Sequence, residues 1–521
     1  MTKDSATLEM KYILMNIIFM LLIFTHFHSW SQQFETELNN LVPEKIYLQL
    51  DSKVYASDKI IWFKSVVTNA IDHTPTSISG VLYVELINPN ERVLEKKLIK
   101  LEKGIGDGYF QLSQPAMEGT YLIRAYTEWN KNFGPDFFFK EYIKIFSPSS
   151  KTNKAISKIT LIEKEDYKRS VQAFFDPKTI DSGHSEKIRI IISQKDKKDT
   201  LFIKKNKNDE FILDYDLEDS SQFVTLQLET KNLFSESKTI TLNEDFLDLQ
   251  FFPESGQLVH GIKSRVAFKA IDSKGKGKQV SGEIVDKMGQ LITPFESNAL
   301  GMGYFTLMQV DSSDSYSAKL SIQNTENTSQ TYPLPRVTAL GNVMWVIGKG
   351  NVIRGMASSN YLKNDSIYIK ASCRGQDYFD IKGRLSNGKL LFSLPAHKLP
   401  EGIIALTMMD TPGHIVAERL FFNEQQDQRI QIDLSIDKRN YYQRDLTKLT
   451  INATNKEGHA VDANLSVLAF NKGQLSELQN DREHILSYFL LSSDLKGNIE
   501  NPSFYFGNNP NRRQHLDVLM L

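Results

Sequence analysis

Cysteine is nearly absent from this sequence: Cys373 is the only one in 521 residues. A chain with one cysteine cannot form an internal disulfide, so each domain must be stabilised by its own hydrophobic core. Such a core is feasible at about 100 residues and difficult far below that size. The length alone predicts about three to five domains of this kind.

An excess of one charge sign is also missing. The chain has 62 Lys and Arg residues against 63 Asp and Glu residues, a formal net charge of -1. A balanced chain without long charged runs gives no electrostatic case for binding nucleic acid or an anionic membrane. We therefore expect a protein partner and no nucleic acid.

Motifs of catalysis and metal binding do not occur. The sequence has no Gly-x-Ser-x-Gly and no phosphate loop, and the histidines beyond residue 31 are isolated. Residues 104–108 are glycine-rich, but the strand-like residues 109–112 follow them, which favours a hairpin turn over a phosphate cradle. We expect no catalytic residues, no metal and no cofactor, hence a protein that is not an enzyme.

One long apolar run is present, at residues 12–24, after Met10-Lys11 and before the small residues near 29–31. This arrangement is typical of a secretory signal, and the run is too short to span a membrane. The sequence predicts a signal peptide over 1–31, with Met10 as the better translation start. We expect an exported mature chain without a transmembrane helix, located in the periplasm, on the outer-membrane surface or outside the cell.

Two stretches near the mature N-terminus alternate apolar and polar residues, at 46–50 and 60–64, around a turn at Ser57-Asp58. This period of two is typical of half-buried strands. A similar turn followed by a strand recurs at intervals that fit one immunoglobulin-like sandwich each. These recurrences lie at 183–192, 261–268, 364–371 and 444–451.

The pattern predicts an all-β fold of tandem immunoglobulin-like or macroglobulin-like β-sandwich domains with a short helical C-terminal segment. After the signal peptide, the predicted domains are 32–148, 149–246, 247–336, 337–427 and an incomplete sandwich with a helical insert at 428–521. The last domain should bury too little to close on its own. We expect that it is either truncated or completed by another segment.

The best internal match joins the first and third predicted domains. Residues 62–64 and 106–110 of the first correspond in order to residues 267–269 and 301–305 of the third. Unequal spacing between matched blocks is what insertions in surface loops produce.

The first strand pair carries a family resemblance. Asp51, a Tyr four residues later at Tyr55 and an acidic turn at Asp58 resemble the start of the MG2 domain of the alpha-2-macroglobulin family, although that family usually has Gly where Asp58 stands. The resemblance implies an envelope or extracellular location and endopeptidase inhibition by entrapment. In some bacterial relatives it implies attachment to outer-membrane receptor modules with a TonB plug. The single cysteine favours a bacterial member.

The thioester of that family is not expected here. Cys373 and Gln376 have its spacing, but an alternating strand at 367–371 precedes them. Free cysteines are among the most buried residues. We interpret Cys373 as an ordinary strand residue, which leaves covalent trapping without support.

Residues 128–139 form the most promising binding loop. Trp129 and Phe133 stand beside Asn and Lys between the last two predicted strands of the first sandwich. Aromatic residues are enriched at interface hot spots. We predict that both bind a partner; the alternative is that they pack on a neighbouring domain.

Residues 471–514 follow a strand-like run at 463–470 and are long and polar. An exposed segment of this kind would be a protease target and could act as bait. The alternative is an ordered helix over 475–491 that completes the fifth domain.

Overall fold

The computed structural model describes residues 42–89, 91–112, 119–146, 155–164, 169–180, 184–194, 197–218, 223–229, 235–242, 246–321, 331–469, 482–507 and 509–521. The predicted signal peptide and the start at Met10 lie outside these residues. None of the described helices is both long and apolar enough to cross a membrane.

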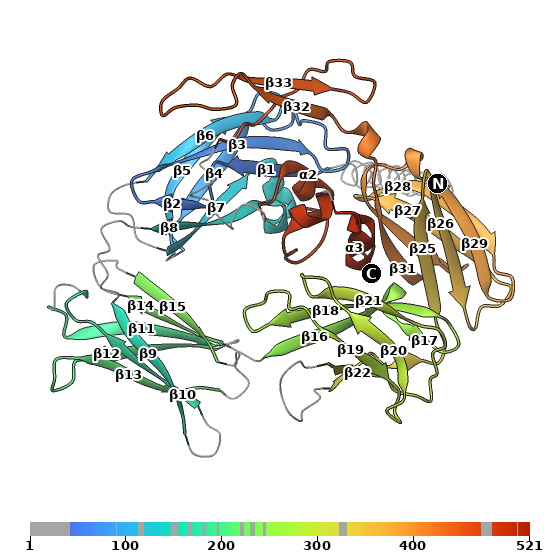
Figure 1. Cartoon of the computed structure of the whole chain (residues 1–521), viewed down its shortest axis with the longest axis horizontal. Helices are drawn as coiled ribbons and strands as arrows, with labels where there is room; N and C mark the ends of the chain where they lie inside the picture. The colour runs from blue at the N-terminus through green and yellow to red at the C-terminus, as the bar shows by residue number, and fades with distance from the viewer. Residues whose placement is uncertain are drawn as a thin grey trace, which may run out of the picture.

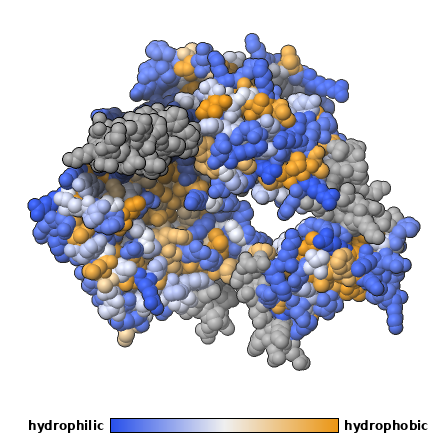
Figure 2. Space-filling model, turned by 180° about the vertical axis from the view of Figure 1, so that it is seen from behind, coloured by the Kyte–Doolittle hydropathy of each residue, from blue (hydrophilic) through white to orange (hydrophobic). Residues whose placement is uncertain are grey.

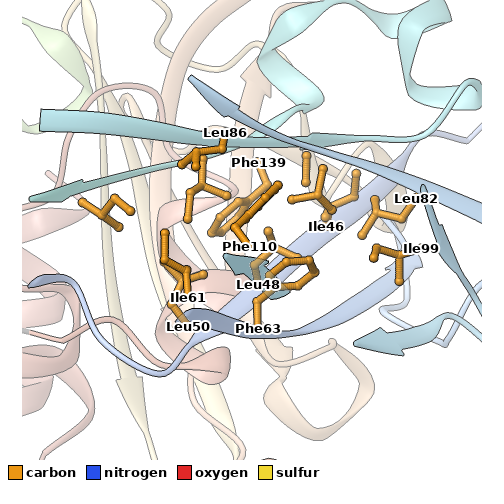
Figure 3. Packing of buried hydrophobic residues seen from close by; sticks show 14 of the residues in the cluster. Ile46, Leu48, Leu50, Ile61, Phe63, Leu82, Leu86, Ile99, Phe110 and Phe139 are labelled. Atoms are coloured by element: carbon orange, nitrogen blue, oxygen red, sulfur yellow. The ribbon is translucent and has the colours of Figure 1, made fainter. Parts of the chain in front are cut away.

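Unit 1 is a sandwich of a three-stranded sheet, β1-β3-β6, and a five-stranded sheet, β2-β8-β7-β4-β5. Alternation along β1 turns Ile46, Leu48 and Leu50 toward the second sheet, and all three are buried. Figure 3 shows these side chains packed against Phe110 and Phe139. The strands are β1 (Glu44–Leu50), β2 (Val54–Ala56), β3 (Ile60–Asn69), β4 (Val81–Ile87), β5 (Val93–Lys100), β6 (Ile105–Gln111), β7 (Gly119–Tyr126) and β8 (Phe139–Phe146).

The Asp51–Tyr55 motif is a clamp between β1 and β3. The Tyr55 hydroxyl donates to Asp51 Oδ1 at 2.6 Å and accepts from the Ser52 amide at 3.0 Å. Asp51 Oδ1 also accepts from the Trp62 amide at 3.0 Å, and the Asp51 amide donates to the Trp62 carbonyl. The motif therefore fixes the turn between two strands by hydrogen bonds to the backbone.

Units 2, 3 and 4 each pair a three-stranded sheet with a four-stranded sheet, and unit 3 adds a two-stranded sheet of β17 and β24. Unit 2 contains β9 (Ile156–Glu163), β10 (Arg169–Phe175), β11 (Lys187–Gln194), β12 (Lys197–Lys204), β13 (Phe211–Asp216), β14 (Phe223–Glu229) and β15 (Ser235–Thr241). Unit 3 contains β16 (Leu247–Pro253), β17 (Leu258–Val259), β18 (Ser264–Asp272), β19 (Ser281–Val285), β20 (Leu291–Glu296), β21 (Met302–Leu307), β22 (Ser317–Leu320), β23 (Thr331–Pro333) and β24 (Val337–Thr338). Unit 4 contains β25 (Asn342–Lys349), β26 (Val352–Ser359), β27 (Ser366–Cys373), β28 (Gln376–Arg384), β29 (Lys389–Pro395), β30 (Gly402–Met409) and β31 (Ile415–Asn423).

The predicted all-β tandem fold with a short helical C-terminal segment is confirmed. Unit 5, by contrast, is a single antiparallel hairpin of β32 (Gln431–Ile436) and β33 (Leu449–Thr454) among the described residues. In Figure 1 it lies at the top of the molecule, beside unit 1.

The internal match between units 1 and 3 holds in order, but the structure shifts its alignment by two residues. The Val67 amide donates to the Gly104 carbonyl at 2.7 Å, and the Ala270 amide donates to the Gly301 carbonyl at 2.8 Å. Val67 therefore corresponds to Ala270, and Gly104 to Gly301. A shift of two keeps every side chain on its predicted face, so the hydrophobic pattern could not reveal it.

The C-terminal segment, residues 482–507 and 509–521, fills the space enclosed by units 1, 3 and 4 (Figure 1). Figure 2 shows unit 2 standing apart across an opening. The segment contains α2 (Ile485–Ser487), the π-helix η9 (Tyr488–Ser492), the 3-10 helix η10 (Pro502–Phe506) and α3 (Arg512–Leu519).

Aromatic and aliphatic side chains bind the C-terminal segment to its neighbours. The Tyr488 ring lies 5.3 Å from that of Tyr47, and Phe489 belongs to the core of unit 1. On the other side, the segment forms a cluster with Ile403 and Phe422 of unit 4. The buried residues that the C-terminal segment contributes to this cluster are Leu490, Leu491, Tyr505, Leu516 and Met520.

This packing corrects the expectation for residues 471–514. Residues 482–507 are packed against the sandwiches and do not form a freely exposed segment, although 496–498 remain exposed. Residues 471–481 lie outside the described residues. The alternative helix over 475–491 is not continuous, because residues 482–484 are not helical; within the described residues, helix begins at Ile485 and packs on units 1 and 4. Local helical preference could not reveal these distant partners.

Four charged side chains, two of them buried and two partly buried, connect α3 to units 3 and 4. Glu254 accepts from Arg419 Nε at 3.0 Å and from Arg265 Nη2 at 2.6 Å. Asp517 accepts from Arg419 Nη2 at 2.6 Å and from Arg265 Nη1 at 2.8 Å. Arg419 is only 2% exposed and Glu254 only 1%. Two cations thus compensate two carboxylates, as buried charges require.

We predict that Arg419→Met destabilises this junction by about 3–5 kcal/mol, because Glu254 and Asp517 then share a single cation. Hydrogen exchange of the α3 and β31 amides measures the loss as faster local opening. The control is Arg189→Met, which removes a surface ion pair with Glu229 and should cost less than about 1 kcal/mol. Equal exchange at α3 in the two variants would show that the charge cluster does not hold the junction.

A second polar cluster joins η9 to units 1 and 4. Asp494 pairs with Lys45, and Arg374 Nη1 lies 3.8 Å from Asp494 Oδ2. The His73 ring lies 5.1 Å from that of Phe489, and its Nε2 lies 3.4 Å from Lys45 Nζ. Burial, with the nearby Arg374 and Lys45 cations, lowers the pKa of His73 to about 3.

This cluster predicts a loss of stability in acid. Between about pH 6.5 and about pH 3, the unfolded chain protonates His73 while the folded chain does not, so stability falls as pH falls. Between about pH 7 and about pH 4.5, His73→Asn should reduce the acid-induced loss of unfolding free energy by about 2 kcal/mol. Asn tolerates the positive φ of 60° at this position.

The measurement is the opening free energy of η9 from hydrogen exchange at several pH values. His414→Asn, at an exposed side chain, is the control. An unchanged pH profile for His73→Asn would disprove this assignment.

Candidate functional site

The predicted binding residues lie on a short 3-10 helix, η1 (Trp129–Phe133), between β7 and β8. Phe133 packs between two rings, at 5.8 Å from Trp129 and 5.7 Å from Phe137. Trp129 Nε1 donates to the Val42 carbonyl at 2.9 Å. These contacts all belong to the first sandwich and its N-terminal edge, and they hold both rings half-buried at the surface.

Asn130 attaches this helix to the core. Its side chain accepts from the Glu44 amide at 3.0 Å and donates to the Glu44 carbonyl at 3.0 Å. It also donates to the Phe137 carbonyl at 3.1 Å. Because Asn130 is fully buried, these bonds are shielded from competing water and fix the helix on β1.

The Glu44 carboxylate lies beneath the same region and is fully buried. It accepts hydrogen bonds from three hydroxyl groups: Thr76 at 2.7 Å, Ser79 at 2.7 Å and Thr127 at 2.6 Å. Thr76 and Ser79 belong to the loop before β4, and Thr127 follows β7. Glu44 therefore connects the two chain segments that border the surface beside Trp129.

An open groove of about 500 Å³ lies between these two segments. One wall carries the exposed apolar side chains of Ile78 and Val81, and the other carries Trp129. An ion pair between Glu128 and Lys131, at 2.8 Å, lies at its rim. Apolar walls with polar groups at the rim suit a protein side chain or an extended segment. The groove is lined by Ile78, Ser79, Gly80, Val81, Tyr83, Glu128, Trp129 and Asn132.

The sequence thus led to Trp129, which lines the groove, and to Phe133, whose ring packs edge-on against Trp129. It did not lead to Glu44 or Asn130, which position them. Glu44 starts a strand and looks like an ordinary solvent-facing residue, and its hydroxyl partners are up to 83 residues away. No local pattern could have identified it.

Cys373 ends β27 and is buried, as expected. Burial raises the pKa of its thiol to about 11, which keeps the thiol protonated and unreactive at neutral pH. Among the residues that the structure describes, no group of three or more His, Cys, Asp or Glu side chains could hold a metal ion.

The solved structures that match this chain at low identity include bacterial alpha-2-macroglobulins. The native Escherichia coli protein is 10% identical, with a TM-score of 0.33 over 80% of this chain and 32% of its own. The trypsin-activated E. coli form is 11% identical, with a TM-score of 0.35 over 80% of this chain and 33% of its own. Salmonella alpha-2-macroglobulin reacted with methylamine is 10% identical, with a TM-score of 0.32 over 80% and 32%.

This chain therefore spans about a third of the length of those proteins. No protein-family model and no curated protein sequence matches it. The class of protein is defined by its own sheets: a tandem β-sandwich protein with a helical C-terminal segment between the sandwiches.

We predict that Glu44→Gln destabilises the groove by about 2 kcal/mol, because a carboxamide offers one acceptor oxygen to three hydroxyl donors. Hydrogen exchange of η1 and of the loop before β4 measures this loss. Glu102→Gln, at an exposed side chain, should change exchange by less than about 0.5 kcal/mol. If the two variants exchange alike at η1, Glu44 does not organise the groove.

Proposed function

We propose that this chain is a non-catalytic binding protein of the cell envelope or extracellular space, and that its partner is a protein. The observation that carries the proposal is the groove beside Trp129. Its walls are held in place by the buried Glu44 and Asn130, so little ordering entropy opposes binding. Trp and Tyr side chains on such a preorganised surface are typical binding hot spots.

Protease binding, and with it endopeptidase inhibition, is the activity that we propose first. The Asp51–Tyr55 motif carries the sequence resemblance to the alpha-2-macroglobulin family. The clamp formed by these residues supports its relevance, because both members take part in the strand pairing of unit 1. Noncovalent binding is proposed, since the buried Cys373 offers no reactive thioester.

A second candidate is a periplasmic or extracellular module of a TonB-linked outer-membrane receptor or uptake assembly. The observation in its favour is the hairpin of unit 5, whose apolar residues are exposed. A protein that works inside a larger assembly can leave such a surface for a neighbour to cover.

The test uses trypsin and elastase whose active sites are chemically blocked, so that binding is measured without cleavage. Wild-type chain should form a complex, measured by titration calorimetry. Trp129→Ala/Phe133→Ala should weaken binding by at least about 30-fold, or about 2 kcal/mol. The control is Tyr142→Ala, at an exposed aromatic residue on β8 of the same unit.

Loss of binding in the double variant with an unchanged melting temperature supports the groove as the contact surface. Equal binding by both variants would exclude the groove. If the wild-type chain binds neither protease, trypsin and elastase are excluded as partners, and the receptor-module candidate is favoured.

A further inference from the structure

Unit 5 repeats the clamp of unit 1 with the same spacing and geometry. The Tyr441 hydroxyl donates to Asp437 Oδ1 at 2.6 Å and accepts from the Lys438 amide at 3.1 Å. Asp437 Oδ1 also accepts from the Lys448 amide, eleven residues later, at 2.9 Å. Asp51 and Tyr55 make the same bonds in unit 1, where the strand amide is also eleven residues on.

The turn that follows the second strand is repeated as well. In unit 5, the Val461 amide donates to the Ala453 carbonyl at 3.0 Å. In unit 1, the Thr76 amide donates to the Val67 carbonyl at the same distance. β32 and β33 are therefore counterparts of β1 and β3, and Ala453 is the counterpart of Val67.

The two units differ in what covers them. Counted from the clamp aspartate, Ile432, Leu434, Ile436 and Leu449 correspond to the core residues Ile46, Leu48, Leu50 and Phe63. The four core residues of unit 1 are 0–4% exposed, whereas their counterparts are 50%, 66%, 54% and 41% exposed. In unit 1 a five-stranded sheet lies on this face. The apolar face of unit 5 thus corresponds to the inner face of the unit 1 sandwich, and no second sheet covers it among the described residues.

An edge of unit 5 is also open. β3 lies between β1 and β6, and β18 lies between β16 and β21, but β33 has only β32 beside it among the described strands. Natural edge strands usually carry Lys, Pro or a bulge that blocks pairing. β33 reads Leu-Thr-Ile-Asn-Ala-Thr and has no charged residue and no proline. Its sequence suits a central strand.

Units 1 and 3 show which strand belongs on this edge. In both, a glycine carbonyl accepts from the amide that corresponds to Ala453: Gly104 for Val67 and Gly301 for Ala270. A side chain at either glycine would place its Cβ 2.2–2.3 Å from a backbone carbonyl oxygen. The matching strand therefore begins at a glycine with positive φ and continues antiparallel to β33.

The described chain after β33 does not supply this strand. Asn464 and Leu465 lie on unit 1, where both accept hydrogen bonds from Lys64. The C-terminal segment binds units 1, 3 and 4. We propose that β33 accepts an antiparallel strand from a partner protein other than a second copy of this chain, a glycine-led strand of the β6 type, and that the exposed face of Ile432, Leu434, Ile436 and Leu449 packs on the apolar residues of that partner.

The proposal can be tested with a peptide of the β6 sequence, residues 104–112, added to the whole chain. Hydrogen exchange with mass spectrometry should show at least about fivefold slower exchange over 447–453. A peptide with the same residues in scrambled order is the ligand control. Slower exchange at β33 with the β6 peptide alone supports the proposal, and protection by both peptides or by neither overturns it.

Two variants test whether the peptide binds to the apolar face of unit 5 or to exposed apolar side chains in general. Leu449→Asp should weaken peptide binding at least about tenfold, because it places a charge on the apolar face of β33 itself, next to the added strand. Leu391→Asp, at an exposed leucine of β29 in unit 4, should bind as wild type does. Equal weakening by both variants would overturn the proposal. Concentration-dependent dimerisation that Leu449→Asp abolishes would also overturn it, since a second copy would then be the occupant.

Discussion

The pairing of Arg419 and Arg265 with Glu254 and Asp517 is the constraint on which the packing of the sandwiches depends. A guanidinium that is 2% exposed cannot remain unpaired, because burying a lone charge costs far more than any single contact returns. Both carboxylates must therefore be in place at once, one from unit 3 and one from α3. The cluster fixes where the C-terminal segment lies, and that segment in turn supplies Phe489 to the core of unit 1.

The fold could be predicted from the sequence wherever one strand and its neighbour in the chain determine the pattern. Alternation at Ile46, Leu48 and Leu50 indicated a strand, although β1 is buried on both faces because Tyr47 is also covered. The polar turn at Ser57-Asp58 was also recognised, but it separates the short strand β2 from β3. The place of residues 482–521 could not be predicted in this way. Their partners include Arg265, Arg419 and Lys45, which lie up to 449 residues away, and no local periodicity encodes such a distance.

The candidate site shows the same division between local and long-range information. Trp129 and Phe133 could be predicted because their residue types and their position between two strands are local features. Glu44 could not, because its role depends on three hydroxyl groups that only the folded sandwich brings together. The aromatic residues offer the contact area, and the buried carboxylate makes that area rigid. A surface with both properties binds with less loss of entropy than a mobile loop of the same composition.

In unit 5, the hydrogen-bonded turn forms from residues close in the sequence, whereas burial of the apolar face needs a partner. The clamp of Asp437 and Tyr441 forms with the same bonds as in unit 1, although the face it orders is uncovered. In unit 1, burial is the largest cause that raises the pKa of Tyr55, whereas the bond to Asp437 is the largest cause for Tyr441. The hydrogen-bonded turn is thus independent of the second sheet, and only the burial of the apolar face depends on it. A hairpin that is already in register presents an edge and an inner face together, so an incoming strand needs to order only itself.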